Sequence, residues 1–249
     1  MHRHVVPELL DELPPDDPRA IHSRGDLRRV NALMGNADIM ARELAGSERT
    51  RPTKLPADGV RRAGPFGPAV AMSIVELGGG DGTFLLELAT RLGAIGPVNL
   101  TLVDQQSLVT DATRAKLLSQ RWQLHTVQAD VFEWLETPGA NLADVIVANL
   151  FLHHFHDPRL QILLSGAAHR TRRFLACEPH RSGAALAAAS LMGFIGCNRV
   201  TVHDARISVR AGFRDRELTR LWPQSGWITR ESKAGRFTHA FQAWRQDAA

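Results

Sequence analysis

A glycine-rich turn is the part of the sequence best suited to hold a ligand. It follows the apolar run Ile74–Leu77 and precedes a helix-forming run that begins at Thr83. Glycines at positions 78, 80 and 82 let the backbone bend tightly and let a ligand approach without meeting a Cβ atom. The free N–H groups at the start of the following helix face the same point. The pattern predicts a nucleotide-cofactor site.

Acidic residues around this turn indicate the class of cofactor. A dinucleotide site spaces its glycines as G-x-G-x-x-G over a pyrophosphate, whereas this turn has G-x-G-x-G with Glu76 before it and Asp81 inside it. Carboxylates repel a pyrophosphate but suit a ligand with a cationic end and no phosphate, such as S-adenosylmethionine. A nicotinamide oxidoreductase is therefore disfavoured. A Walker A loop is excluded because no Gly-Lys-Ser/Thr follows.

Two more acids follow predicted strands. Val98–Asp104 has the pattern of the second parallel strand of a βαβ unit, so Asp104 would lie at its carboxyl end and accept hydrogen bonds from both ribose hydroxyls. The alternative is an acid that only opens a loop. Asp130 is suited to accept from an adenine amino group, with the Val131 N–H directed at an adenine ring nitrogen. Asp130 is equally suited to cap the helix predicted over Val131–Leu135, and the two roles can coexist.

A fourth segment combines a buried strand with histidines. Ala143–Leu152 is almost continuously apolar and leads directly into the polar turn His153–Asp157. Strands buried on both faces have this pattern, and ligands of open α/β sheets bind outside the carboxyl ends of the strands. We therefore expect the reaction to take place at this turn.

These segments, in this order, resemble the motifs of class I S-adenosylmethionine-dependent methyltransferases. Glu76–Gly82 is similar to the first motif, Asp104 to the ribose-binding acid, Ala129–Val131 to the adenine-binding motif and Asn149–Asp157 to the fourth motif. The resemblance covers most of the chain and implies S-adenosylmethionine as the cofactor. The candidate cofactor-binding residues are Glu76, Gly78, Gly80, Asp104, Gln105, Asp130, Val131, Asn149 and Leu150.

The resemblance also implies the fold class and its domains. We expect an α/β fold with a Rossmann-like sheet of seven strands, helices on both faces, and an N-terminal helical segment. Its fifth strand would be Phe174–Glu178, and a closing antiparallel pair would lie near Trp227–Glu231 and Phe237–Trp244. Residues 1–68 would form an arm, a helical cap and a linker, and residues 69–249 the methyltransferase core.

The N-terminal part is predicted in three pieces. Residues 1 to about 20 are rich in prolines and acids and are expected to be an extended arm, and residues 21–50 are expected to form two helices broken around Gly35–Asn36. The proline-rich stretch Arg51–Pro68 is predicted to be a linker. Helices in this position either cover the acceptor site or form a dimer interface. The alanine-rich stretch Ala184–Ile195 is expected to be a second, apolar wall of that site.

The histidine turn suggests the catalytic base. His153–Asp157 is similar to the His-Asp-Trp-x-Asp turn of methyltransferases that act on phenols, in which the first histidine is the base; here His154 replaces the acid and Phe155 the tryptophan. His153 is the first candidate and His154 the second, because adjacent residues leaving a strand point in different directions. A histidine with a pKa of about 6.5 can accept the proton of a phenol at neutral pH.

More remote candidates for the base are His180 and His203. For every histidine the alternative is a hydrogen-bonded residue that holds a loop. A metal site formed by His153, His154 and His156 is disfavoured, since three histidines so close in one turn rarely converge on one ion, and the paired acids of magnesium-dependent catechol methyltransferases are absent. We therefore expect no metal.

The charge distribution and the apolar stretches indicate which partners and which cellular location to expect. The net charge of +4 comes from dispersed basic residues, and Asn149–Leu152 lacks the Asn-Pro-Pro-aromatic sequence of nucleic-acid amino-methyltransferases, so no nucleic acid is expected. The N-terminus has no secretory pattern, and the longest uncharged stretch, Gly183–Asn198, is shorter than a membrane-spanning helix, so no membrane is expected. Cys177 and Cys197 are expected to be inert packing residues. A cytoplasmic protein is predicted.

The sequence thus predicts a methyltransferase that O-methylates a hydroxyl of a small aromatic or polyketide-derived metabolite of secondary metabolism. Asp26–Asn36 and Cys197–Phe213 resemble segments of bacterial methyltransferases found beside type III polyketide synthases. One alternative is an N- or C-methyltransferase of a small molecule. Another is a protein that binds S-adenosylmethionine without catalysis. The oligomeric state stays open.

Overall fold

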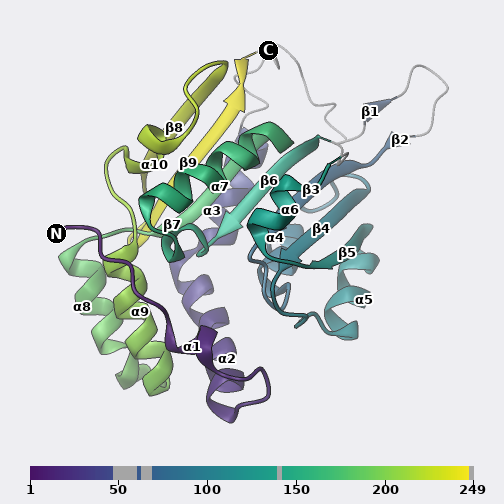
Figure 1. The fold of residues 1–249 in the computed structure, drawn as a ribbon. Coiled ribbons are helices and arrows are strands. Elements are labelled where there is room, and N and C mark those ends of the chain that lie inside the picture. The colour runs from purple at the N-terminus through teal and green to yellow at the C-terminus, as the bar shows by residue number, and fades with distance from the viewer. Residues whose placement is uncertain (47–60, 63–68, 139–141, 247–249) are drawn as a thin grey trace.

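A sheet of seven strands forms the centre of the molecule (Figure 1). The computed structural model describes residues 1–46, 61–62, 69–138 and 142–246. The strand order is β5-β4-β3-β6-β7-β9-β8; β9 runs antiparallel to both of its neighbours, and the pairs from β5 to β7 are parallel. The strands are β3 (Met72–Leu77), β4 (Val98–Asp104), β5 (Trp122–Gln128), β6 (Ala143–Asn149), β7 (Thr171–Pro179), β8 (Trp227–Ala234) and β9 (Thr238–Arg245).

The predicted sheet is therefore confirmed, including the fifth strand and the closing antiparallel pair. The central strands are apolar because both of their faces are covered. In β6, Ile146 and Ala148 belong to one core cluster and Val145 and Val147 to another, as the alternation of side chains along a strand requires.

Helices cover the two faces of the sheet. Leucines of α6 (Val131–Glu136), α7 (Asp157–Arg170) and α10 (Glu217–Leu221) pack in the first cluster. Residues of α3 (Asn36–Gly46), α4 (Thr83–Leu92) and α5 (Asp111–Ser119) pack in the second. This arrangement is the α/β architecture that the sequence predicted.

The N-terminal helices differ from the prediction in one respect. Helix α2 (Pro18–Met34) ends at Gly35, which has a φ of 68°, and α3 follows directly, so the predicted break is confirmed. The arm over residues 1–20 is not extended throughout, because it contains the helical turn α1 (Leu9–Glu12) and α2 begins within it. Helix α2 starts early because Asp17 accepts the Arg19 N–H and Pro18 occupies the first helical position.

The predicted linker lies almost wholly outside the described residues. Within it, Arg61–Arg62 (β1) pairs antiparallel with Ala69–Val70 (β2). Both cysteines of the chain are buried and free, as expected. In the described part of the chain, no helix combines the length and the apolar character needed to cross a bilayer.

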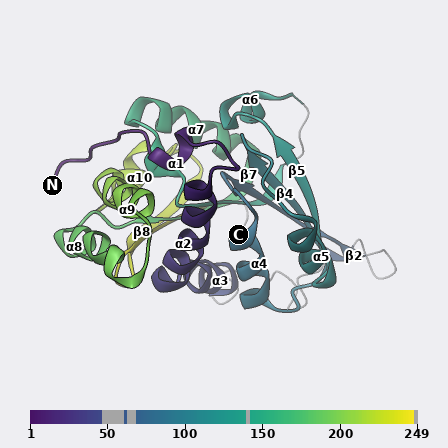
Figure 2. The same cartoon turned by 90° about the horizontal axis from the view of Figure 1, so that it is seen from below.

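Several helices gather below the carboxyl ends of the parallel strands (Figure 1). They include α8 (Gly183–Leu191), its 3-10 extension η2 (Met192–Ile195) and α9 (Arg199–Ala211). Seen from below, α2 lies between α9 and α4 and contacts both (Figure 2). Asp26 of α2 is completely buried and accepts hydrogen bonds from the Asn198 N–H (2.9 Å) and the Thr201 hydroxyl (3.0 Å) at the start of α9. This carboxylate attaches α2 to α9.

Replacing Asp26 by alanine is expected to destabilise the fold by about 1–3 kcal/mol, because buried donors of α9 lose their acceptor. Urea unfolding measures this loss. The matched control is Asp38→Ala: Asp38 pairs with Arg91, both side chains are 53% exposed, and such a surface pair contributes at most about 1 kcal/mol. Equal, small losses in the two variants would show that Asp26 does not hold α2 in place.

Candidate functional site

The motif segments line one cavity of about 710 Å³ at the carboxyl ends of β3, β4 and β6. Helices α2, α8 and α9 supply its other walls. The lining includes all the candidate cofactor-binding residues and the first two candidate bases: Glu76, Gly78, Gly80, Asp104, Gln105, Asp130, Val131, Asn149, Leu150, His153 and His154. His180 and His203 are not among the described residues that line it. The topology therefore brings together residues that are far apart in the sequence.

The glycine turn approaches the fourth motif closely. Gly78 has a φ of 68° and donates its N–H to the Val103 carbonyl oxygen at 2.8 Å. A Cβ atom at Gly78 would lie 2.1 Å from the ring of Phe151. Glycine is required there because the conformation is left-handed and the aromatic ring packs directly on the backbone.

Glu76 presents a buried carboxyl group to the cavity. Only 1% of the residue is exposed, yet it lines the cavity, and Oε2 has no hydrogen-bond partner among the described residues. Burial, together with the charges of Asp104 and Asp81, raises its pKa well above the ordinary value. A cationic group in the cavity would offset this unfavourable burial. Glu76 therefore suits the ammonium end of a ligand.

Asp104 is oriented by backbone donors. Its Oδ2 accepts the Gly80 N–H at 2.9 Å and its Oδ1 the Gln106 N–H at 2.8 Å. Each carboxylate oxygen keeps capacity for a further hydrogen bond. This geometry fits a carboxylate that also accepts from neighbouring hydroxyls.

Asp130 caps a helix. Its Oδ1 accepts the Phe132 N–H at 2.7 Å at the start of α6, and its Oδ2 accepts the side-chain amide of Gln105 at 2.9 Å. The capping role anticipated as an alternative is therefore present. It coexists with a place in the cavity lining.

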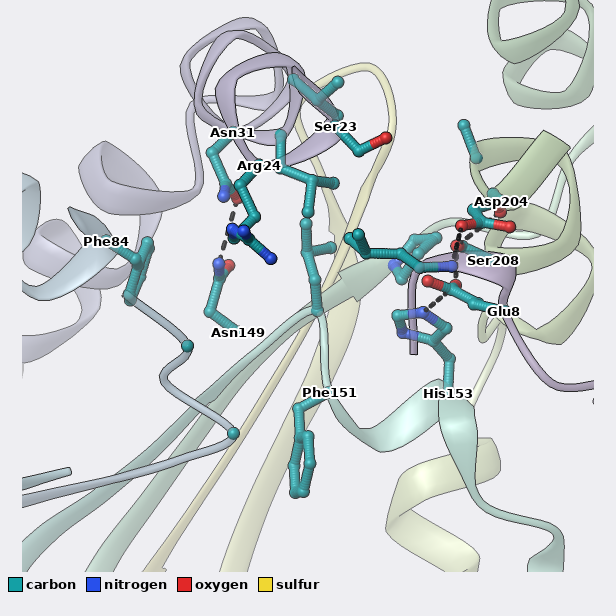
Figure 3. A pocket seen from close by; sticks show the side chains of 18 of the residues that line it. Glu8, Ser23, Arg24, Asn31, Phe84, Asn149, Phe151, His153, Asp204 and Ser208 are labelled. Carbon is teal, nitrogen blue, oxygen red and sulfur yellow. Dashed lines mark hydrogen bonds and ion pairs between the residues drawn. The ribbon is translucent and has the colours of Figure 1, made fainter. Parts of the chain in front are cut away.

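Asn149 connects the sheet to the N-terminal helices (Figure 3). It donates to Oδ1 of Asn31 at 3.0 Å and accepts from Nδ2 of Asn36 at 2.8 Å. Asn36 in turn accepts from the Thr238 hydroxyl at 2.7 Å. The sequence indicated a cofactor contact for Asn149 and did not reveal this network. The next residue, Leu150, has a φ of 52° and donates its N–H to the Cys177 carbonyl oxygen.

His153 lies between two carboxylates. The side chain is only 4% exposed; Nδ1 is 2.7 Å from Oε2 of Glu178, and Nε2 is 3.3 Å from Oε1 of Glu8. Burial and the nearby His154 lower the pKa of His153, but the hydrogen bonds to Glu178 and Glu8 outweigh them, so the pKa is raised. Burial raises the pKa of the Glu8 carboxyl, but the hydrogen bonds to both histidines outweigh this and hold it far below its ordinary value.

Glu178 is a site residue that sequence reasoning missed. Its completely buried carboxylate also accepts backbone N–H groups of Phe151 (3.0 Å), Leu152 (2.8 Å) and His153 (3.3 Å). The available signal was its position: Glu178 is an acid near the carboxyl end of a parallel strand, as Glu76 and Asp104 are. Glu8 was also missed, because nothing in the arm's composition shows where it docks.

Both histidines line the cavity, because the chain enters the 3-10 helix η1 (Leu152–His154) instead of continuing as a strand. Nδ1 of His154 is 2.9 Å from the Phe151 carbonyl oxygen, and Nε2 is 3.6 Å from Oε2 of Glu8. Burial lowers the pKa of His154, but Glu8 and Asp11 raise it more, to about 9.

Glu8, His153 and His154 each place one potential ligand atom within 4.8 Å of the others. Among the described residues this is the one set of three acids, histidines or cysteines with metal-like spacing, and His156 is not part of it. Glu8 forms ion-pair contacts with both histidines, and the two histidine rings lie against each other with their centroids 4.2 Å apart.

Residues 74–173 match a family model described as a methyltransferase domain. No curated protein matches the chain. Similar solved structures include an O-methyltransferase family protein from Burkholderia thailandensis (16% identity, TM-score 0.56). The alignment covers 92% of this chain and 60% of the Burkholderia protein.

Two further solved structures have similar folds. The plantazolicin methyltransferase BamL, solved with a desmethylplantazolicin analogue and SAH, aligns over 95% of this chain and 92% of its own (10% identity, TM-score 0.62). The amino-demethyl-riboflavin dimethyltransferase RosA from Streptomyces davawensis aligns over 96% and 62% (15% identity, TM-score 0.55). The chain thus spans less than two thirds of the Burkholderia protein and of RosA.

These similarities agree with the geometry of the cavity. The matched segment begins in β3, includes the glycine turn and ends in β7, so it contains all four motif segments. The strand order and the covering helices are those of the fold that the sequence resemblance implied. Residues 74–173 are therefore similar to a methyltransferase domain, and the chain shares its fold with solved methyltransferases.

Proposed function

We propose that the chain is an S-adenosylmethionine-dependent methyltransferase that O-methylates a hydroxyl of a small aromatic molecule. The observation that carries the proposal is the position of His153. Its ring lines the cavity, Nδ1 is fixed by the buried Glu178, and Nε2, which lies 3.3 Å from Oε1 of Glu8, is the ring nitrogen that an acceptor hydroxyl would reach. A histidine held in this way is suited to remove the proton of a hydroxyl.

The residues of the glycine turn fit the cofactor. Glu76 would bind its ammonium group, Asp104 its ribose hydroxyls, and Asp130 with Val131 its adenine edge. Oε2 of Glu76 has no hydrogen-bond partner among the described residues, which supports this assignment because a cation would offset the cost of burying a carboxylate. When bound, S-adenosylmethionine supplies an electrophilic methyl group on a sulfonium centre.

The chain's own residues would prepare the acceptor. Its hydroxyl donates to Nε2 of His153, and the proton moves to that nitrogen as the oxygen becomes nucleophilic. Glu178 keeps Nδ1 protonated and stabilises the imidazolium that forms, as a carboxylate does behind a catalytic histidine. Holding both reactants in line supplies much of the remaining rate, about 7–11 kcal/mol in oriented systems.

The walls of the cavity support a small, largely apolar acceptor. Ala185 and Ala189 of α8 and Met192 of η2 line it, together with Val209 of α9. This is the apolar wall expected from the alanine-rich stretch. An origin of the acceptor in polyketide metabolism stays a prediction.

We propose that residues 1–68 comprise an arm, a helical cap and a linker, and that the cap covers a core formed by residues 69–249. The hydrogen bonds of Asn31 and Asn36 to Asn149 support this division, as do the cavity-lining side chains of α2. A cap at this end of the sheet would exclude water from the acceptor.

Calorimetric titration should show saturable binding of S-adenosylmethionine and of its demethylated product, and no binding of NAD. Asp104→Ala is expected to weaken the binding at least about tenfold, since a hydrogen bond to a charged group contributes about 1.5–3 kcal/mol. Glu76→Gln, which keeps the size and removes the charge, should weaken it as well.

The control for these variants is Asp111→Ala, which removes an exposed acid of α5 outside the cavity lining and should bind the cofactor normally. Thermal unfolding of Asp104→Ala must accompany the titration, because Asp104 also holds the Gly80 N–H. Binding of NAD, or of neither sulfur compound, would contradict the assignment of the cofactor.

Replacing His153 by alanine is expected to lower kcat/KM for a phenolic acceptor about 10²–10⁴-fold, the usual contribution of a general base. Binding of the cofactor should not change. His169→Ala, which removes an exposed histidine of α7, is the matched control. Unchanged turnover in the His153 variant would favour a nitrogen acceptor that loses its proton readily, and would exclude the role proposed for His153.

The pH profile of kcat/KM provides an independent check of the base. Four ionisable groups surround His153: Glu178, Glu8 and His154 directly, with Asp11 behind them. Because only the neutral ring accepts a proton and its pKa is raised, kcat/KM should increase with pH through a value above about 6.5. Glu8→Gln removes one raising partner, so the increase should occur at lower pH. A profile independent of pH between about 5 and 9 would exclude His153 as the base.

A further inference from the structure

The N-terminal arm places Glu8 at the acceptor end of the cavity and is anchored on both sides of it. Before Glu8, Arg3 donates to Asp157 (2.6 Å) and to the Phe155 carbonyl oxygen (2.8 Å). After Glu8, the N–H groups of Leu9 and Leu10 donate to the two carboxylate oxygens of Asp204 on α9, each at 2.9 Å. The position of Glu8 is therefore fixed by hydrogen bonds on both sides of it in the chain.

Contacts of its own side chain fix the carboxylate of Glu8 further (Figure 3). The Ser208 hydroxyl of α9 donates to Oε1. The same oxygen is 3.3 Å from Nε2 of His153, and the side chain of Glu8 is only 12% exposed. The proposed base and a nearly buried carboxylate thus stand side by side in the cavity wall.

This pairing sets a requirement for the acceptor. Without a ligand, a protonated Nε2 of His153 donates a hydrogen bond to the Glu8 carboxylate. A hydroxyl that donates to Nε2 needs that nitrogen unprotonated, so Glu8 loses the hydrogen bond from His153 and keeps the Ser208 hydroxyl and the ion-pair contact with His154. Leaving a buried charged acceptor short of a donor costs about 1–3 kcal/mol or more. A second donor on the ligand, next to the first, would replace the lost hydrogen bond.

We propose that the acceptor carries two hydroxyl groups on neighbouring ring carbons, one donating to Nε2 of His153 and the other to the carboxylate of Glu8. Glu8 is then a residue that determines specificity. The 3.3 Å between Nε2 and Oε1 suits this pair, because vicinal hydroxyls direct two parallel donors at neighbouring acceptors. The inference rests on the proposed O-methylation and names the class of its substrate.

The apolar surroundings strengthen the requirement. Around Glu8 and the histidines, Ala205 and Val209 of α9 and, on the α8 side, Ala189 and Met192 are apolar and offer no donor. The polar lining residues of α9 are Thr201, Asp204 and Ser208, and the Ser208 hydroxyl is already directed at Oε1 of Glu8 and at the Asp204 carbonyl oxygen. A site built to pair with a substrate hydroxyl discriminates strongly against the analogue that lacks it.

The test compares matched acceptors in the full chain. The pairs are 2,3-dihydroxynaphthalene with 2-naphthol and catechol with phenol, with S-adenosylmethionine saturating. The wild type is expected to show a kcat/KM at least about tenfold higher for the dihydroxy member of each pair. The monomethyl ether product should be a poor acceptor, since it retains one donor. Transfer should therefore stop after one methyl group.

The Glu8→Gln variant tests whether Glu8 is the residue that determines the preference for a dihydroxy acceptor. Its preference for the dihydroxy acceptor should fall to within about threefold, because a neutral amide left unpaired costs less than a charged carboxylate. The ratio of the two kcat/KM values is the readout, since a change in the pKa of His153 or a partly unfolded sample alters both values together. Glu12→Gln, an exposed glutamate of the same arm outside the cavity lining, should keep the wild-type ratio.

Each of the following three results would overturn the inference. Equal transfer to both members of the pairs overturns it while the proposed O-methylation stands. Absence of transfer to every hydroxylated ring overturns the proposed function and the inference with it. Loss of transfer after chelation and recovery with a divalent metal ion would show that Glu8 and the histidines bind a metal instead of the second hydroxyl.

Discussion

The buried carboxylate of Glu178 determines the geometry on which the acceptor end of the cavity depends. Burying a charge is costly unless donors surround it. Glu178 receives three backbone N–H groups from the turn after β6 and the Nδ1 proton of His153. The same hydrogen bonds that make its burial tolerable impose the 3-10 turn and fix the tautomer of His153. The position of the proposed base is thus a consequence of satisfying one charge at the end of β7.

The N-terminal segment completes the cavity through a second set of polar contacts. Asn149 forms amide hydrogen bonds with Asn31 and Asn36. The arm that precedes α2 places Glu8 against His153. These contacts are polar, so they require specific orientations. The result is a cavity to which residues 69–249 contribute the glycine turn, the histidines and the walls from α8 and α9, while the N-terminal residues contribute Glu8 and side chains of α2.

The sequence predicted the parts of this molecule that depend on local pattern. Apolar runs ending in Glu76, Asp104 and Asn149 located three of the parallel strands, and Gly35 located the break between α2 and α3. Contacts across long separations were not predictable. Glu8 lies 145 positions from His153, and no periodicity indicates that an acid in a proline-rich arm will dock there. The Asn149 network depends on the packing of two helices whose orientation no motif specifies.

The two ends of the cavity use buried carboxylates in opposite ways. At the glycine turn, Oε2 of Glu76 has no partner among the described residues, so burial raises its pKa and leaves it ready for a cationic ligand. At the histidine turn, Glu178 and Glu8 face one ring from both sides. A buried carboxylate oxygen without a hydrogen-bond donor favours the binding of a cation. A histidine between two carboxylates favours the transfer of a proton. This difference in pairing supports the proposal that the cofactor binds at one end of the cavity and the acceptor at the other.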